Sequence, residues 1–213
     1  MLFEDLKKQI KMGDGTGSTT AYAPQRKSST LVCVDIQEGA PLGKMDVESL
    51  AEFIQGYEKV FFIIDQIMTT DPAPPDDLID SFKNGKFPKN VEILEKEYGG
   101  LLRIAVDLDL ENEAVSFFKD LRSSKDRDFL EKHHDEFLKA MLNEMGDDNY
   151  DDLFNRFDAV QDELVSGIDE SIVDRMGDEI DLCGGARGEC LKEMEMMFEI
   201  MGLEVNLVPQ FTY

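Results

Sequence analysis

Residues 180–190 read Ile-Asp-Leu-Cys-Gly-Gly-Ala-Arg-Gly-Glu-Cys, and this stretch decides the fold. Its first four residues have the short, apolar character of a buried strand, and the glycines that follow allow a tight turn. Residues 191–201 then carry apolar side chains at helical spacing, Gly202 is a helix stop, and Val205–Val208 predicts a last strand. A strand, a glycine-rich turn, a helix and another strand form the repeating unit of an α/β fold.

The same alternation runs through the first half of the chain. The β-branched run Leu31–Ile36 predicts a strand buried on both faces, as in a parallel sheet. Asp46 is a candidate N-cap for a following helix, and Val60–Ile64 predicts the next strand. Val91–Leu94 predicts a further short strand. The pattern therefore predicts a three-layer α/β fold with a mostly parallel sheet.

Length and composition predict one folded domain with an arm and an insertion. The 213 residues suit a single core, and 42% hydrophobic residues are too many for a disordered acidic chain. Residues 1–30 include a Gly/Ser/Thr-rich segment without apolar periodicity, which predicts an N-terminal arm. Residues 31–213 are the predicted domain, with an inserted acidic helical segment at about 104–177.

The net charge of −24 argues against several classes of function. A surface this negative repels phosphate groups, so we expect no nucleic-acid partner. No apolar run approaches the roughly 20 residues of a membrane span, and no secretory signal is visible, so we expect no membrane association. Three cysteines without paired spacing fit reduced thiols and a cytoplasmic location. The adjacent His133 and His134 would point about 100° apart on a helix, so no metal site is predicted.

Three residues are candidates for chemistry, and each has a structural alternative. Cys190 lies at the start of a predicted helix, where the dipole favours a thiolate, but a free cysteine can equally be core packing. Asp35 ends the first strand, at the edge where α/β sheets bind ligands, but it can also cap a loop. Lys96 leaves a short strand before a glycine-containing turn, but it can also be a solvated surface lysine.

The order of these residues resembles the isochorismatase-like cysteine hydrolases. That family includes isochorismatases, nicotinamidases and carbamoylases, and it uses an Asp–Lys–Cys triad on a Rossmann-like α/β/α sandwich. The chain has an Asp-x-Gln after its first strand, a lysine leaving a central strand, and a Gly-Gly-Ala-x-x-x-Cys turn before a helix. The resemblance implies that Cys190 is the nucleophile, that Asp35 takes its proton, and that Lys96 stabilises the thiolate.

The resemblance also implies further details of the site. It implies a cis peptide between Gly185 and Ala186, with the N–H groups of Ala186 and Cys190 as an oxyanion hole. Gln37 and Arg187 are candidate substrate-binding residues, and no cofactor is implied. Arg187 can clamp a carboxylate with two hydrogen bonds, or it can pair with a nearby acid, Glu189 or Asp181, and brace the turn.

The chain departs from the family at several positions. Arg187 and Gly188 stand where the family usually has Thr followed by Asp or Asn. Asp65 is followed by no histidine of the kind that completes the nicotinamidase metal site, which disfavours nicotinamide hydrolysis. Residues 96–103 and 183–190 together are similar to a phage-encoded branch of the family.

Two functions follow as alternatives from the sequence. The first is a cofactor-independent cysteine hydrolase that acts on a small carbonyl, amide or vinyl-ether substrate, with Cys190 as a thiol of lowered pKa. The second is a catalytically degenerate hydrolase fold that serves as an acidic interaction module. The partners to expect are a small-molecule substrate and, beyond it, another copy of the chain or a basic protein.

Overall fold

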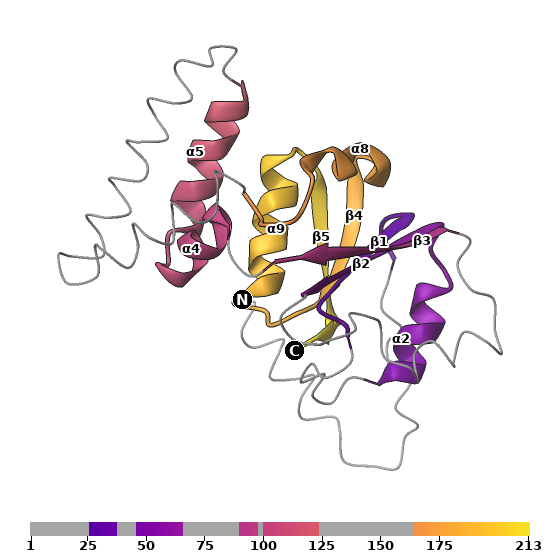
Figure 1. The fold of residues 1–213 in the computed structure, drawn as a ribbon. Coiled ribbons are helices and arrows are strands. Elements are labelled where there is room, and N and C mark those ends of the chain that lie inside the picture. The colour runs from indigo at the N-terminus through magenta and orange to yellow at the C-terminus, as the bar shows by residue number, and fades with distance from the viewer. Residues whose placement is uncertain (1–25, 38–45, 66–89, 98–99, 124–163) are drawn as a thin grey trace, which may run out of the picture.

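A single parallel sheet organises the computed structural model, which describes residues 26–37, 46–65, 90–97, 100–123 and 164–213. Its order is β3-β2-β1-β4-β5, and every neighbouring pair is parallel (Figure 1). The strands are β1 (Thr30–Val34), β2 (Lys59–Asp65), β3 (Asn90–Lys96), β4 (Glu179–Gly184) and β5 (Glu204–Thr212). The order reverses direction between β1 and β4, which makes this pair the topological switch point.

Helices cover both faces of the sheet and give the three layers that the sequence predicts. One face packs against α2 (Val47–Ile54), and the other packs against a group of helices that includes α9 (Cys190–Ile200). That group also contains α4 (Leu101–Asp107), α5 (Glu111–Ser123), the 3-10 helix η2 (Glu170–Ile172) and α8 (Val173–Met176). The fold is therefore a Rossmann-like α/β sandwich.

Alternation along β1 divides the core between the two faces. Leu31 and Cys33 belong to the apolar cluster under α2, whereas Val32 and Val34 belong to the cluster under α4, α5 and α9. All five residues of β1 are buried, as expected for a central strand covered on both sides. Apolar side chains therefore cover β1 on both faces of the sheet.

The observed boundaries agree with the sequence at most elements. The Asp46 side chain caps α2 as predicted, accepting hydrogen bonds from the Glu48 and Ser49 amides at 3.2 and 3.3 Å. The last strand continues to Thr212, beyond its predicted end at Val208, because Pro209 is tolerated on a strand at the sheet edge. The strand that carries Lys96, predicted to be central, lies at one end of the sheet that the described strands form.

The predicted arm and insertion are described only in part. Residues 1–25 and 124–163 lie outside the described residues. The end of the arm contacts the sheet, since the Lys27 amide donates to Asp181 at 3.0 Å. The described ends of the predicted insertion, including Phe118 and Ile172, are buried in the same core as α9.

Candidate active site

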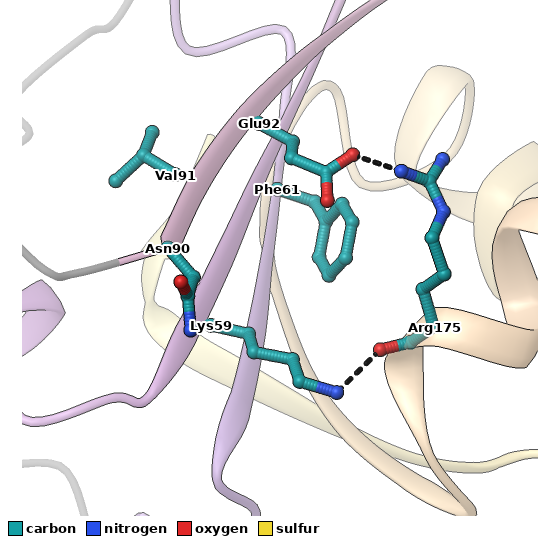
Figure 2. Close-up of a pocket in the computed structure, with 6 residues that line it drawn as sticks. All are labelled: Lys59, Phe61, Asn90, Val91, Glu92 and Arg175. Carbon is teal, nitrogen blue, oxygen red and sulfur yellow. Dashed lines mark hydrogen bonds and ion pairs between the residues drawn. The ribbon is translucent and has the colours of Figure 1, made fainter.

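One pocket lies at the amino ends of β2 and β3 (Figure 2). Its volume is about 400 Å³, and an ion pair between Arg175 and Glu92 lies along its wall. The lining residues are Lys59, Phe61, Asn90, Val91, Glu92 and Arg175. Open α/β sheets bind ligands at the opposite, carboxyl edge. None of the residues selected from the sequence lines this pocket.

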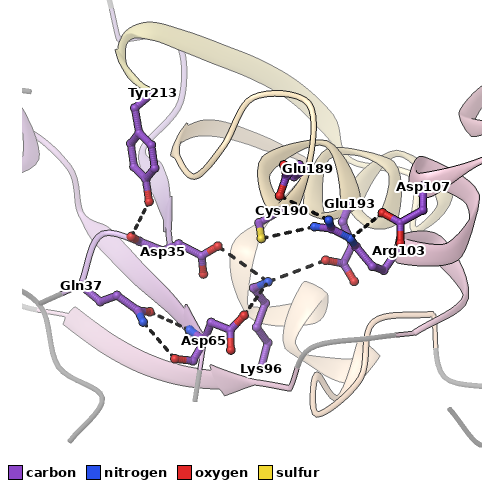
Figure 3. A network of polar contacts seen from close by, with 10 residues as sticks. All are labelled: Asp35, Gln37, Asp65, Lys96, Arg103, Asp107, Glu189, Cys190, Glu193 and Tyr213. Atoms are coloured by element: carbon purple, nitrogen blue, oxygen red, sulfur yellow. Dashed lines mark hydrogen bonds and ion pairs between the residues drawn. The ribbon is translucent and has the colours of Figure 1, made fainter. Parts of the chain in front are cut away.

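The three candidates for chemistry, Asp35, Lys96 and Cys190, meet at the carboxyl edge of the sheet, beside the switch point (Figure 3). Asp35 directly follows β1, Lys96 ends β3, and Cys190 begins α9 after β4. Lys96 Nζ lies 3.7 Å from Asp35 Oδ2, and both side chains interact with the Cys190 thiol. The structure therefore brings together the three residues that the resemblance implies as a triad.

Asp35 occupies a constrained position between β1 and the rest of the site. Its φ of 51° lies in the left-handed region, which is uncommon for a residue with a side chain. Its amide donates to the Ile63 carbonyl at 2.8 Å, and its carbonyl accepts from the Tyr213 hydroxyl at 2.9 Å. Burial raises the pKa of the Asp35 carboxyl above its ordinary value, although Lys96 and Cys190 offset part of this effect. A carboxylate of raised basicity is well suited to accept a proton.

Lys96 lies at the centre of three buried carboxylates. Its ammonium is 3.7 Å from Asp35, 3.8 Å from Asp65 and 3.7 Å from Glu193, and its side chain is 1% exposed. Burial favours the neutral amine, but the acids outweigh that effect, and the net pKa of Lys96 lies above its ordinary value. Lys96 is therefore a buried, charged group and not the solvated surface lysine of the alternative interpretation.

Cys190 is partly exposed at the first position of α9, and its thiol is less acidic than the sequence led us to expect. Burial and the neighbouring Asp35 carboxylate raise the pKa of the Cys190 thiol to about 12, although Lys96 lowers it in part. Arg103 Nη1 lies 3.7 Å from the sulfur as a second cation. The direction of this shift is opposite to the predicted one, because burial and the Asp35 carboxylate outweigh the effect of Lys96.

The nucleophile turn is formed by two glycines and contains no cis peptide. Gly184 and Gly185 have φ values of 93° and 38°, and every peptide bond of the described residues is trans. The cis peptide implied between Gly185 and Ala186 is wrong, because the two left-handed glycines already reverse the chain. Within the described part of the chain, the amides of Ala186 and Cys190 donate to no protein group, so both can serve an oxyanion.

Gln37 connects the ends of β1 and β2. Its Nε2 donates to the Asp65 carbonyl at 2.9 Å, and its Oε1 accepts from the Asp65 amide at 2.7 Å. The side chain is completely buried. Gln37 therefore holds the backbone of Asp65 in place, and a contact with substrate stays a prediction.

Arg187 lies on the exposed side of the nucleophile turn. Both acids proposed to pair with it are engaged elsewhere, since Glu189 pairs with Arg103 at 3.3 Å and Asp181 accepts from Tyr57 at 2.6 Å. Among the described residues, its guanidinium has no ion-pair partner, and only its amide is held, by the Tyr213 carbonyl at 3.0 Å. Pairing within the turn is thus not observed, and recognition of an anion by Arg187 stays a prediction.

Three charged residues of the site were not selected from the sequence: Asp65, Arg103 and Glu193. Asp65 ends a strand just as Asp35 follows one, so its position at the carboxyl edge was a usable signal. Glu193 follows Cys190 by three residues, which places both on one helix face. Arg103, on α4, gave no local signal, since only the packing of α4 against α9 brings it to Cys190.

Comparison with known proteins identifies no relative, so the function of the site is interpreted from its geometry. Neither a protein-family model, nor a curated protein, nor a solved structure matches the chain. Among the described residues, no group of three or more His, Cys, Asp or Glu side chains is arranged to hold a metal ion. The described helices are all too short or too polar to cross a membrane.

Proposed function

We propose that the chain is a cysteine hydrolase of the isochorismatase-like class that acts on a small carbonyl, amide or vinyl-ether substrate without a cofactor. The observation that carries this proposal is the convergence of Asp35, Lys96 and Cys190 beside the switch point of the sheet. Two amides in the nucleophile turn that have no acceptor among the described residues support it further, because acyl transfer requires donors for an oxyanion.

In this proposal, with an ester or amide substrate, the proton of Cys190 moves to Asp35 while the sulfur attacks the substrate carbonyl carbon. A thiol with a pKa of about 12 is neutral before attack, and the neighbouring carboxylate has a raised pKa. This pairing favours transfer of the proton during attack over prior formation of a thiolate. The amides of Ala186 and Cys190 would hold the resulting oxyanion. When the intermediate collapses, the leaving group takes the proton from Asp35, and a water activated by Asp35 then hydrolyses the thioester.

Turnover of a panel of small esters, amides and vinyl ethers by purified protein tests this function. We expect Cys190→Ala to abolish hydrolysis, and Asp35→Asn to reduce kcat/KM by roughly 10²–10⁴-fold, the usual contribution of a general base. Glu195→Gln serves as a matched control on α9, because Glu195 pairs with Lys192 outside the site. Hydrolysis that survives unchanged in Cys190→Ala would overturn the proposal.

A degenerate hydrolase fold with an interaction role is the second candidate. The raised pKa of the Cys190 thiol favours it, because a neutral thiol is a poor nucleophile. The net charge of −24 would suit a basic protein partner. Absence of turnover on the whole panel, together with capture of a basic protein that is lost at high salt, would favour this candidate over the enzyme.

A further inference from the structure

The buried cluster around Lys96 contains more negative than positive charge. The carboxyl groups of Asp35, Asp65 and Glu193 all lie within 3.8 Å of the single ammonium, and all four side chains are at most 5% exposed. If every acid were ionised, three buried carboxylates would share the Lys96 ammonium, and the nearby Arg103 is already paired with Asp107 and Glu189. Such charge is costly in a protein interior, so the cluster is expected to bind an additional proton.

Glu193 is the best placed of the three acids to hold that proton. Its Oε2 faces Lys96 at 3.7 Å, whereas its Oε1 is buried and accepts no hydrogen bond from the described residues. Asp35 also has an unpartnered oxygen, but the proposed function needs Asp35 ionised so that it can accept the thiol proton. The charged groups that face Glu193 are Lys96 on β3, Arg103 on α4, Asp35 after β1 and Asp65 on β2.

We propose that Glu193 is a positioning residue that stores a proton in its carboxyl group and thereby sets how strongly Lys96 stabilises the Cys190 thiolate. The inference rests on the proposed function in taking Cys190 as the nucleophile and Asp35 as its ionised base. When Glu193 is protonated, Lys96 is shared between two carboxylates and more of its field acts on the sulfur. When Glu193 ionises, a third carboxylate opposes the thiolate.

The protonation of Glu193 changes in a physiological range of pH. Burial raises the pKa of the Glu193 carboxyl to about 7, although Lys96 and Arg103 lower it in part. Below this pH the cluster holds the proton, and above it the proton is lost. The thiolate of Cys190 should therefore become harder to form as the pH rises through about 7.

The rate of Cys190 alkylation by iodoacetamide, followed by peptide mapping from about pH 6 to 10, tests the inference, since the thiolate is the reactive form. Above pH 7, we expect Glu193→Gln to react about tenfold faster than wild type, the equivalent of one pKa unit. The difference should close below pH 7, where wild-type Glu193 is itself neutral. Glu195→Gln, which removes the same charge from the outer side of α9, should match wild type throughout.

A purely structural role for Glu193 would give a rate ratio that does not change with pH, and that result would overturn the inference. Equal rates in wild type and Glu193→Gln above pH 7 would overturn it as well. Should Glu193→Gln fail to fold, the wild-type protein alone tests the inference. Its alkylation rate, plotted on a logarithmic scale against pH, must then rise less steeply near pH 7, and a straight line contradicts the inference. Alkylation of Cys190 does not require turnover of a substrate. A pH-dependent ratio of the two alkylation rates, without hydrolysis of any substrate in the panel, would therefore count against the proposed function and not against the role of Glu193.

Discussion

Lys96 is the residue on which the electrostatics of the site depend. It is buried by the same packing that buries Asp35, Asp65 and Glu193, and it is also the cation that lowers the pKa of Cys190. Arg103 adds a second positive charge next to the sulfur, but Asp107 and Glu189 share it, at 3.0 and 3.3 Å. The Cys190 thiolate must therefore share the positive charge of Lys96 and Arg103 with several carboxylates.

The ionisation of Glu193 should also appear in the stability of the protein. Folding raises the pKa of this carboxyl from 4.5 to about 7, so the folded state prefers the protonated form. Its stabilising contribution is complete below pH 4.5 and is lost as the pH rises through about 7. Relative to wild type, Glu193→Gln should gain about 3 kcal/mol of unfolding free energy between these limits.

Urea unfolding of wild type and Glu193→Gln at a series of pH values measures this difference. The variant should gain most of its relative stability between about pH 4.5 and 7, and little outside that window. A difference that is flat across this window would mean that Glu193 does not bind its proton more tightly in the folded state.

At the scale of elements, the turn from β4 to α9 determines where Cys190 lies. Gly184 pairs with Val34 of β1, and a Cβ built on Gly184 would lie 2.1 Å from the Val34 carbonyl oxygen. The end of the chain holds the same region, because Tyr213 joins the Arg187 amide to the Asp35 carbonyl. The base and the nucleophile are thus supported by one connected set of backbone contacts.

Gly184→Ala should therefore destabilise the protein by about 2–4 kcal/mol, because the clash is with backbone and φ is positive. Gly188→Ala is the matched control in the same turn, since nothing lies within 4 Å of its built Cβ. We expect the control to change the unfolding free energy by less than about 0.5 kcal/mol. Equal effects of the two substitutions in denaturant unfolding would show that the close approach of β4 to β1 is not needed.

At the scale of the whole molecule, local patterns in the sequence predicted the layers and part of the site. Apolar runs gave β1, β2 and β4, and Asp46 gave the start of α2, because these features depend on a few consecutive residues. Asp35 and Cys190 were found because each directly follows a strand or begins a helix. The edge position of β3 could not be predicted in this way, since it depends on how distant strands pair.

The balance of positive and negative charge in the site also could not be predicted from the sequence. Arg103 reaches Cys190 only because α4 packs on α9, and Glu193 meets Lys96 only because α9 covers the sheet. A helix start and a lysine suggested an acidic thiol, but burial of the thiol and the Asp35 carboxylate, which follows β1, oppose its ionisation. Burial and the charged groups that packing places around a side chain, and not its local sequence, decide the direction of such a pKa shift.

Acylation of Cys190 tests the central claim most directly. Wild-type protein is mixed with p-nitrophenyl acetate, quenched in acid at short times and analysed by intact mass and peptide mapping, since ester hydrolysis by a cysteine nucleophile passes through a thioester. The proposed function predicts a single acetyl group on Cys190 that forms and then decays, that forms much more slowly in Asp35→Asn, and that is absent in Cys190→Ala. Acetylation that spreads over surface lysines and is unchanged in Cys190→Ala would contradict the account.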